Sequence, residues 1–302
     1  MDKLVIAGGT GTIGQFLIQH LKERFSDIVV LSRSAGSGDG FRKVKWDGKE
    51  QGAWSRELDG ADVVINLAGK SIQSRFTESN KKALYDSRVD TTTTIGTAIQ
   101  LAERPPHIWF NASGAAIYPA TGPAQANDET VKEIGEGFKS QLSVAWEEAA
   151  LKFQREGTRQ VILRITPVLN AEDGFLPPIL RITRLGLGGR QGSGKQMVSW
   201  IHYQDLCRAV KFIMDHEGLS GIFNLAAPGP LTNADMMRKL RKAIGMPFGL
   251  PAPAFGIKLG AYIMGIEPSL ILESSHVVPG ALHKAGFDFS YPDFESAIEN
   301  LI

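Results

Sequence analysis

The sequence predicts an α/β protein, in which a Rossmann-type, doubly wound parallel sheet is followed by a smaller C-terminal substrate domain. Three observations lead to this prediction. The apolar residues 4–6 run directly into a turn that carries Gly8, Gly11 and Gly14 at three-residue spacing. Apolar runs of strand length then alternate with amphipathic stretches of helical period, as in βαβ units. After Pro167 the elements become shorter and Gly and Pro more frequent, which indicates a second domain.

The glycine turn is the first candidate binding site. Its glycines suit a tight exit from the strand, close backbone approach to a pyrophosphate and close packing of the next helix. That helix aims its free N–H groups and positive dipole end at the phosphates. A similar turn also occurs in sheets that bind nothing, so the surrounding βαβ pattern supports the assignment. The predicted cofactor contacts here are Gly8, Thr10, Gly11, Thr12, Ile13 and Gly14.

The residues after the second strand, 28–31, favour NADP over NAD. An NAD site usually places a carboxylate there, whereas this chain has Ser32 and Arg33. The guanidinium of Arg33 can grip a 2′-phosphate, with the serine hydroxyl as a further donor. Arg33 could also be an ordinary solvated charge at a strand end. Asp47, which ends the next strand, could accept a hydrogen bond from the adenine amino group or simply cap a turn.

The remaining elements are assigned in order from their apolar patterns. Residues 61–69 contain a buried strand and a small turn, where Leu67, Ala68 and Gly69 would let a cofactor pass closely. Ser113 stands at the C-terminal end of strand 108–113, the edge at which ligands bind in open α/β sheets. The expected helices are residues 13–22, 78–102, 138–156 and 204–214, the later strands are 41–47, 160–165 and 222–225, and residues 35–40 form a loop.

Two domains are expected. Residues 1–166, with a return segment at about 199–227, would form the NADP-binding Rossmann domain. Residues 167–198 and 228–302 would form the smaller substrate-binding domain. Residues 189–195 match the first part of the P-loop pattern G-x-x-x-x-G-K-[ST], but Gln196 stands where the magnesium-binding Ser or Thr is required. We therefore interpret residues 189–195 as a surface loop and not as a nucleoside-triphosphate site.

Composition limits the partners. The 302 residues include 33 Lys and Arg against 32 Asp and Glu, and this net charge of +1 predicts binding to neither nucleic acid nor membrane. Cys207 is the only cysteine, which excludes an internal disulfide and suits a reducing cytoplasm. The N-terminus shows no signal sequence, so we expect a cytoplasmic protein. No spacing of His, Cys, Asp or Glu residues indicates a metal site. The sequence is compatible with a homodimer.

Several motifs together resemble an extended short-chain dehydrogenase/reductase. They are Gly8-x-x-Gly11-x-x-Gly14, residues 66–69, Ser113 with Tyr118, residues 163–164, and Trp200-Ile-His202-x-x-Asp205. Shorter strings at residues 87–89, 185–189, 199–202, 232–233, 250–255 and 285–287 are similar to the atypical branch of nucleoside-diphosphate-sugar epimerase-like proteins. The resemblance covers nearly the whole chain. It implies a Rossmann domain with a C-terminal substrate domain, and NADP in the groove.

The chain departs from that family at its usual catalytic pair. The family uses Tyr-x-x-x-Lys with a serine: the tyrosine moves the proton, the lysine lowers the tyrosine pKa, and the serine orients the substrate oxygen. Phe138 and Leu142 stand at the expected tyrosine and lysine positions, and neither transfers protons. Ser113 is then the predicted substrate anchor and Tyr118 the best remaining proton donor. For Tyr118 taken alone, however, packing beneath the loop is the favoured interpretation.

Three further residues are candidate substrate contacts, each with a structural alternative. Lys70 follows the Ala68–Gly69 turn but could be a surface lysine. Arg88 could bind an anionic group or pair with a neighbouring aspartate, and His202 could bind substrate or simply be packed. The sequence therefore leaves two functions. One is an NADP-dependent oxidoreductase or epimerase-like enzyme for a small polar molecule, with a nucleotide sugar as one candidate; the other is a catalytically silent NADP(H)-binding sensor or regulatory protein.

Overall fold

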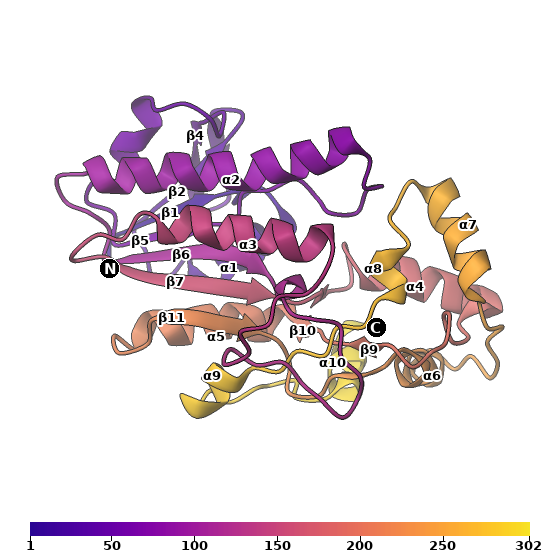
Figure 1. Cartoon of the computed structure of the whole chain (residues 1–302). Coiled ribbons are helices and arrows are strands. Elements are labelled where there is room, and N and C mark those ends of the chain that lie inside the picture. The colour runs from indigo at the N-terminus through magenta and orange to yellow at the C-terminus, as the bar shows by residue number, and fades with distance from the viewer.

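An eight-stranded sheet forms the centre of the computed structural model, which describes residues 1–302 (Figure 1). Its order is β11-β7-β6-β5-β1-β2-β4-β3, and every pair is parallel except β3 with β4. The chain runs outward in both directions from β1, so the topological switch point lies between β1 and β5. The strands are β1 (Lys3–Ala7), β2 (Asp27–Ser32), β3 (Gly36–Gly38), β4 (Phe41–Lys45), β5 (Val63–Asn66), β6 (Ile108–Gly114), β7 (Arg159–Ile165) and β11 (Gly221–Leu225).

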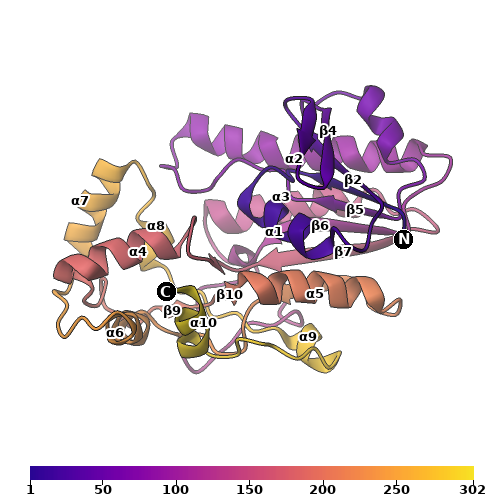
Figure 2. The same ribbon diagram turned by 180° about the vertical axis from the view of Figure 1, so that it is seen from behind.

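Helices cover both faces of the sheet, which confirms the predicted doubly wound α/β fold (Figures 1 and 2). Alternate side chains of each strand point to opposite faces. Leu4 and Ile6 of β1 belong to a core shared with α1 (Thr12–Leu21) and α5 (Tyr203–Asp215). Val5 and Ala7 belong to a second core beneath α2 (Glu78–Leu101), which continues to Ala150 of α3 (Phe138–Leu151). A 3-10 helix, η1 (Ala53–Glu57), adds Trp54 to this second core.

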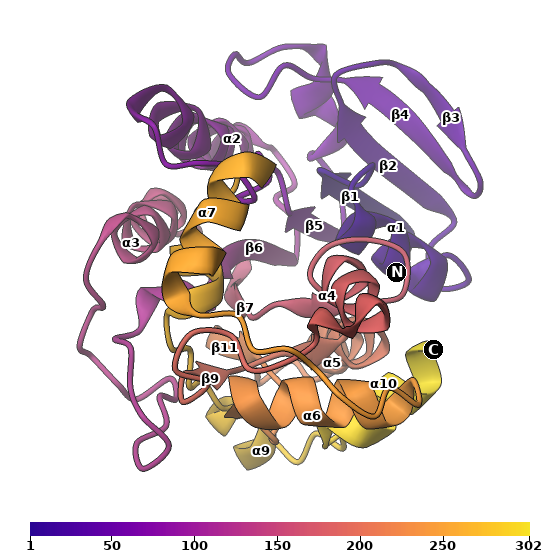
Figure 3. The ribbon, with the colours of Figure 1, turned by 90° about the vertical axis from the view of Figure 1, so that its right-hand side faces the viewer.

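The later part of the chain adds short elements beyond the C-terminal ends of the parallel strands, where α4 and α7 lie (Figure 3). A separate apolar core joins α4, α6 and α10, and Trp200 and Phe294 meet there with ring centroids 5.5 Å apart. The short strands are β8 (Val168–Leu169), β9 (Met197–Val198), β10 (Ile201–His202) and β12 (Leu231–Thr232). The helices are α4 (Leu176–Ile182), η3 (Thr183–Leu187), α6 (Asn233–Ala243), α7 (Ala254–Met264), α8 (Ser269–Leu272), α9 (Gly280–Lys284) and α10 (Phe294–Leu301).

Most predicted elements agree with the structure, and three differ. Residues 35–40 were expected to be a loop, but β3 forms within them and pairs with β4. This exposed edge strand is held by backbone hydrogen bonds and has no apolar alternation that would reveal it. The strand expected at 41–47 ends at Lys45, and the helix expected at 138–156 ends at Leu151, where Phe153 turns back to pack against Gly96.

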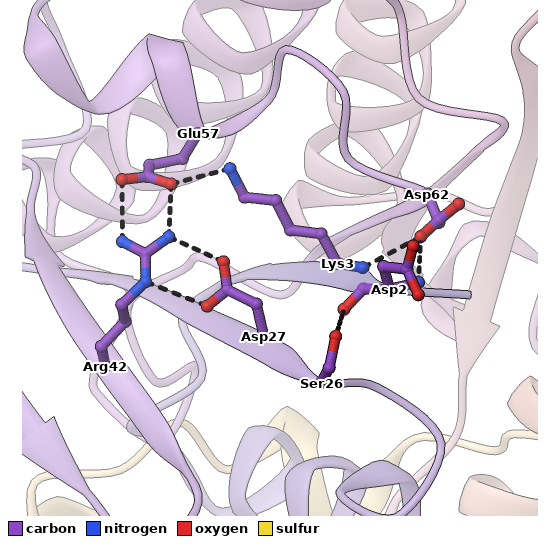
Figure 4. Close-up of polar contacts among 7 residues, drawn as sticks. All are labelled: Asp2, Lys3, Ser26, Asp27, Arg42, Glu57 and Asp62. Atoms are coloured by element: carbon purple, nitrogen blue, oxygen red, sulfur yellow. Dashed lines mark hydrogen bonds and ion pairs between the residues drawn. The ribbon is translucent and has the colours of Figure 1, made fainter.

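An ion-pair cluster ties the N-terminal ends of several strands together (Figure 4). Arg42 of β4 reaches Asp27 of β2 at 2.9 Å and Glu57 of η1 at 2.6 Å. Lys3 of β1 reaches the same Glu57 at 2.8 Å. These hydrogen bonds lower the pKa of Glu57 to about 2. The cluster lies at the opposite ends of the strands from the glycine turn, so its role is to hold the sheet together.

Candidate functional site

The glycine turn joins β1 to α1 at the switch point of the sheet. Gly8 has a φ of 79°, and a Cβ at this position would lie 2.9 Å from the backbone of Leu67. A Cβ on Gly14 would lie 2.5 Å from the Cα of Gly9, so the close contact of helix and turn needs glycine there. Gly11, which precedes α1, differs: a Cβ would approach only the Gly8 carbonyl oxygen, at 3.4 Å. The fold itself requires Gly8 and Gly14, whereas the outer side of Gly11 is open to a ligand.

The N-terminus of α1 contacts a segment from the far part of the chain. The hydroxyl of Thr12 donates a hydrogen bond of 2.6 Å to Asp173, which lies between β8 and α4. Asn170 shapes this segment, because its side-chain oxygen accepts from the backbone N–H groups of Glu172 and Asp173. The Thr12 hydrogen bond lowers the pKa of Asp173. A carboxylate therefore stands beside the start of α1, where Thr10 is exposed and Ile13 partly exposed.

The residues predicted to select the cofactor lie at the C-terminal end of β2. Arg33 is exposed and forms no ion pair or side-chain hydrogen bond in the structure. The hydroxyl of Ser32 donates to the carbonyl oxygen of Ser34 at 2.5 Å. Asp47 is exposed and accepts from the backbone N–H groups of the next turn, which lowers its pKa. Arg33 is thus free to bind an anion, while Asp47 has the geometry of a turn cap.

The turn after β5 lies against the glycine turn. Asn66 holds this turn, since its side-chain oxygen accepts from the backbone N–H of Ala68 at 3.1 Å. The backbone of Leu67 and Ala68 lies directly against Gly8, and Gly69 lies against the side chain of Arg88. Lys70 instead points to Asn80, with 2.9 Å between its ammonium nitrogen and the Asn80 side-chain oxygen. The predicted residues 67–69 therefore border the glycine turn, and Lys70 is occupied at the surface.

Arg88 of α2 has no carboxylate partner. Its guanidinium lies 5.0 Å from the ring centroid of Trp146 and donates one hydrogen bond, of 3.1 Å, to the carbonyl oxygen of Leu84. The neighbouring Asp86 pairs with Lys82 instead. Burial lowers the pKa of Arg88 to about 10. No guanidinium nitrogen of Arg88 is both buried and without a hydrogen-bond partner. The N–H groups that do not bond to Leu84 are therefore accessible and can donate to an anionic group.

Ser113 and Tyr118 belong to one buried polar network, but their hydroxyl groups do not meet. The Ser113 hydroxyl donates to Glu147 of α3 at 2.7 Å, and Glu147 receives two hydrogen bonds of 2.8 Å from Arg164. Arg164 also donates to the Tyr118 oxygen at 2.7 Å, and the Tyr118 hydroxyl donates to Asn224 at 2.9 Å. Both predicted catalytic hydroxyls therefore already have protein partners.

Burial and charge fix the protonation states of Arg164 and Tyr118 in this network. Arg164 and Glu147 each expose 7% of their side chains. Burial alone would lower the pKa of Arg164, but the hydrogen bonds and charge of Glu147 hold it above its ordinary value. Burial raises the pKa of Tyr118. The phenol consequently stays protonated at neutral pH, and Arg164 stays charged.

The positions of the usual catalytic pair are filled by packing. Phe138 begins α3 and its ring lies 5.1 Å from that of Phe76, while Leu142 is buried with 3% exposed. The adjacent Lys139 forms an ion pair of 2.6 Å with Glu273. The structure thus places no proton-transferring group at either position.

His202 is a packing and capping residue. It is fully buried, its ring stacks on that of Tyr291 with centroids 3.9 Å apart, and its Nδ1 accepts from the backbone N–H of Gln204 at the start of α5. Burial lowers its pKa to about 4, so it is neutral in the folded protein. Asp205 accepts from the backbone N–H groups of Ser290 and Tyr291, which ties α5 to the C-terminal segment. This environment favours the packed alternative for His202.

Sequence reasoning missed two residues that shape the site. Glu147 faces the sheet from the middle of α3 and fixes both Arg164 and Ser113. Arg164 lies within the apolar strand 160–165, and a buried charge of this kind requires an acidic partner such as Glu147. Asp173 gave no comparable signal, because its contact with Thr12 spans 161 residues.

The glycine turn at the switch point, the exposed Arg33 after β2 and the small turn after β5 together define a protein of the Rossmann type, a fold that binds dinucleotides at this edge of the sheet. The chain belongs to the NAD dependent epimerase/dehydratase family, whose profile matches residues 4–226. Residues 252–301 match a second profile, a domain of unknown function designated DUF1731. The predicted family resemblance is thereby confirmed.

Three relatives illustrate the relationship. An epimerase family protein of Staphylococcus epidermidis is 32% identical over 302 residues, covering 100% of this chain and 99% of the relative. The crystal structure of human epimerase family protein SDR39U1 with NADPH is 30% identical, with a TM-score of 0.88 over 99% of this chain and 98% of that one. The nucleoside-diphosphate sugar epimerase of Corynebacterium glutamicum is 26% identical, with a TM-score of 0.80 over 99% of this chain and 57% of that one.

Proposed function

We propose that this protein binds NADP(H) and exchanges a hydride with a small polar substrate. The observation that carries the proposal is the free guanidinium of Arg33 beside an open glycine turn, with no carboxylate at the end of β2. The human relative, 30% identical, was crystallised with NADPH. NADP(H), when bound, supplies or accepts a hydride at its nicotinamide ring.

The residues present fit this cofactor. The open side of Gly11 and the free N–H groups of α1 suit the pyrophosphate, and Arg33 with Ser32 suits the 2′-phosphate. The turn at residues 67–69 would border the cofactor further along the groove. Arg88 would donate to an anionic group beyond Gly69, on the cofactor or on the substrate.

Substrate specificity is assigned to the later part of the chain. We assign residues 1–166 with about 199–227 to cofactor binding, and residues 167–198 with 228–302 to substrate binding. A nucleotide sugar is one candidate, because the related protein of Corynebacterium glutamicum is described as a nucleoside-diphosphate sugar epimerase. Arg88 carries positive charge that such a substrate requires, and Lys70 would add a second charge after leaving Asn80. A cytoplasmic location agrees with this chemistry.

Ser113 and Tyr118 remain the proposed catalytic groups. Ser113 would hold the substrate oxygen, and Tyr118 would donate the proton. Each hydroxyl would first have to leave its present partner, Glu147 for Ser113 and Asn224 for Tyr118. Ser113→Ala and Tyr118→Phe variants test this. Loss of turnover with NADP(H) affinity kept supports a catalytic role, whereas unchanged turnover assigns both hydroxyls to structure alone.

A second candidate function is that of an NADP(H) sensor without catalysis. Phe138 and Leu142, packed where the family usually has its catalytic tyrosine and lysine, favour it. A screen of carbonyl substrates, followed through NADPH absorbance, separates the two functions. Oxidation of NADPH by any of them supports the enzyme, and equal binding of NADPH and NADP⁺ without turnover supports the sensor.

A further inference from the structure

Helix α7 is apolar over most of its circumference, yet it lies at the surface. Only Ile257 and Ala261 are buried among its eleven residues, and Lys258 is its single charged residue. Phe255 and Ile263 each expose 75% of their surface. Arg75 stacks on the Tyr262 ring at 3.9 Å, but the rest of the exposed apolar side of α7 lacks a partner.

The exposed apolar residues continue from α7 onto the neighbouring segments. Leu250 donates its backbone N–H to the carbonyl of Gly186, and Phe248 packs against Gly186. These contacts fasten residues 246–252, which lead into α7, to the end of η3. Nine of the chain's fifteen exposed large hydrophobic residues lie here, and we call them the α7 surface: Leu185, Leu187, Phe248, Leu250, Phe255, Leu259, Tyr262, Ile263 and Met264.

Unpaired positive charges accompany this surface. Residues 172–197 and 235–273 contain nine Lys and Arg against five Asp and Glu, whereas the rest of the chain has 24 basic and 27 acidic residues. Only Arg238 and Lys239 among the nine form ion pairs. Arg181, Arg184 and Lys258 are exposed without a carboxylate partner. The end of the molecule that carries α7 (Figure 3) therefore combines apolar side chains with excess positive charge.

We propose that the α7 surface docks the protein on an anionic lipid bilayer. Apolar side chains beside Lys and Arg form the combination that inserts into the interfacial layer while the cations meet acidic headgroups. A second copy of the chain fits less well, because a twofold interface would bring the same unpaired cations face to face. No helix of the protein is long and apolar enough to cross a bilayer, so the contact is peripheral.

Vesicle cosedimentation of the full chain tests this. Vesicles of equal parts phosphatidylglycerol and phosphatidylcholine should retain the protein at low salt, and vesicles of phosphatidylcholine alone should retain at least tenfold less. Added salt should release it. Phe255→Ser should weaken retention about tenfold, because the ring loses its apolar burial. Leu101→Ser is the matched control, since Leu101 exposes 74% at the far end of α2 and should leave retention unchanged.

Three results would overturn the proposal: no retention on the anionic vesicles, equal retention on both vesicle types, or equal loss in both variants. A dimer in light scattering that Phe255→Ser dissociates would also overturn it, in favour of self-association. An unchanged melting temperature of Phe255→Ser shows that the variant folds, because Phe255 is exposed and contributes little to the core.

Discussion

The buried pair of Glu147 and Arg164 should be a large contributor to stability. In Glu147→Gln the side chain keeps its size, but the guanidinium of Arg164 loses its only carboxylate while remaining 93% shielded from solvent. Breaking such a pair from one side costs about 3–5 kcal/mol. For a domain of this size about 2 °C of melting temperature is lost per kcal/mol, so we expect a fall of about 6–10 °C.

Thermal and urea unfolding, each followed by circular dichroism, measure this change. Asp86→Asn is the control, because it removes an exposed ion pair on α2 and should cost less than about 1 kcal/mol. The double variant Glu147→Leu with Arg164→Met removes both charges and should be more stable than Glu147→Gln. A loss below about 1 kcal/mol in Glu147→Gln, or a double variant no better than it, would refute the reasoning.

Three further predictions concern the groove and the sheet. Asp173→Asn should raise NADP(H) affinity several-fold in calorimetry, because it removes a negative charge beside the proposed pyrophosphate position; weaker binding would contradict this. Gly14→Ala should lower the melting temperature, whereas Gly11→Ala should keep it and lose NADP(H) affinity, and a reversed pattern would show the glycine roles to be misassigned. Arg42 depresses the pKa of Glu57 from 4.5 to about 2, so the stability that Glu57 contributes is present above pH 4.5 and lost towards pH 2. The stability difference between wild type and Glu57→Gln should vanish over that window, and a constant difference would count against the pairing.

The sequence was sufficient to predict the sheet and its glycine turn because both depend on local patterns. Apolar runs and helical periods lie within one element, and α2 begins at Glu78 as predicted despite its run of four threonines. Thr91 and Thr94 do not break the helix, because their hydroxyls bond to carbonyl oxygens three or four residues earlier. Strand β3 was missed since it has no such pattern.

The site was less predictable because its key contacts join distant residues. Tyr118 and Ser113 were placed correctly at the ends of the sheet, but the partners that occupy their hydroxyls come from α3, β7 and β11. The burial of His202 depends on Tyr291, 89 positions later in the chain. Net charge is an average over the whole chain, so the value of +1 does not reveal that basic residues gather near α7.

Calorimetric titration of nucleotide-free protein with NADP(H) and NAD(H), beside Arg33→Asp, tests the proposed cofactor most directly. NADP(H) should bind more tightly than NAD(H), and Arg33→Asp should weaken NADP(H) about tenfold to a hundredfold through loss of charge-assisted hydrogen bonds. Arg104→Asp, an exposed arginine before β6, should leave both affinities unchanged. Binding of neither nucleotide, or an unchanged preference in Arg33→Asp, would contradict the proposed function.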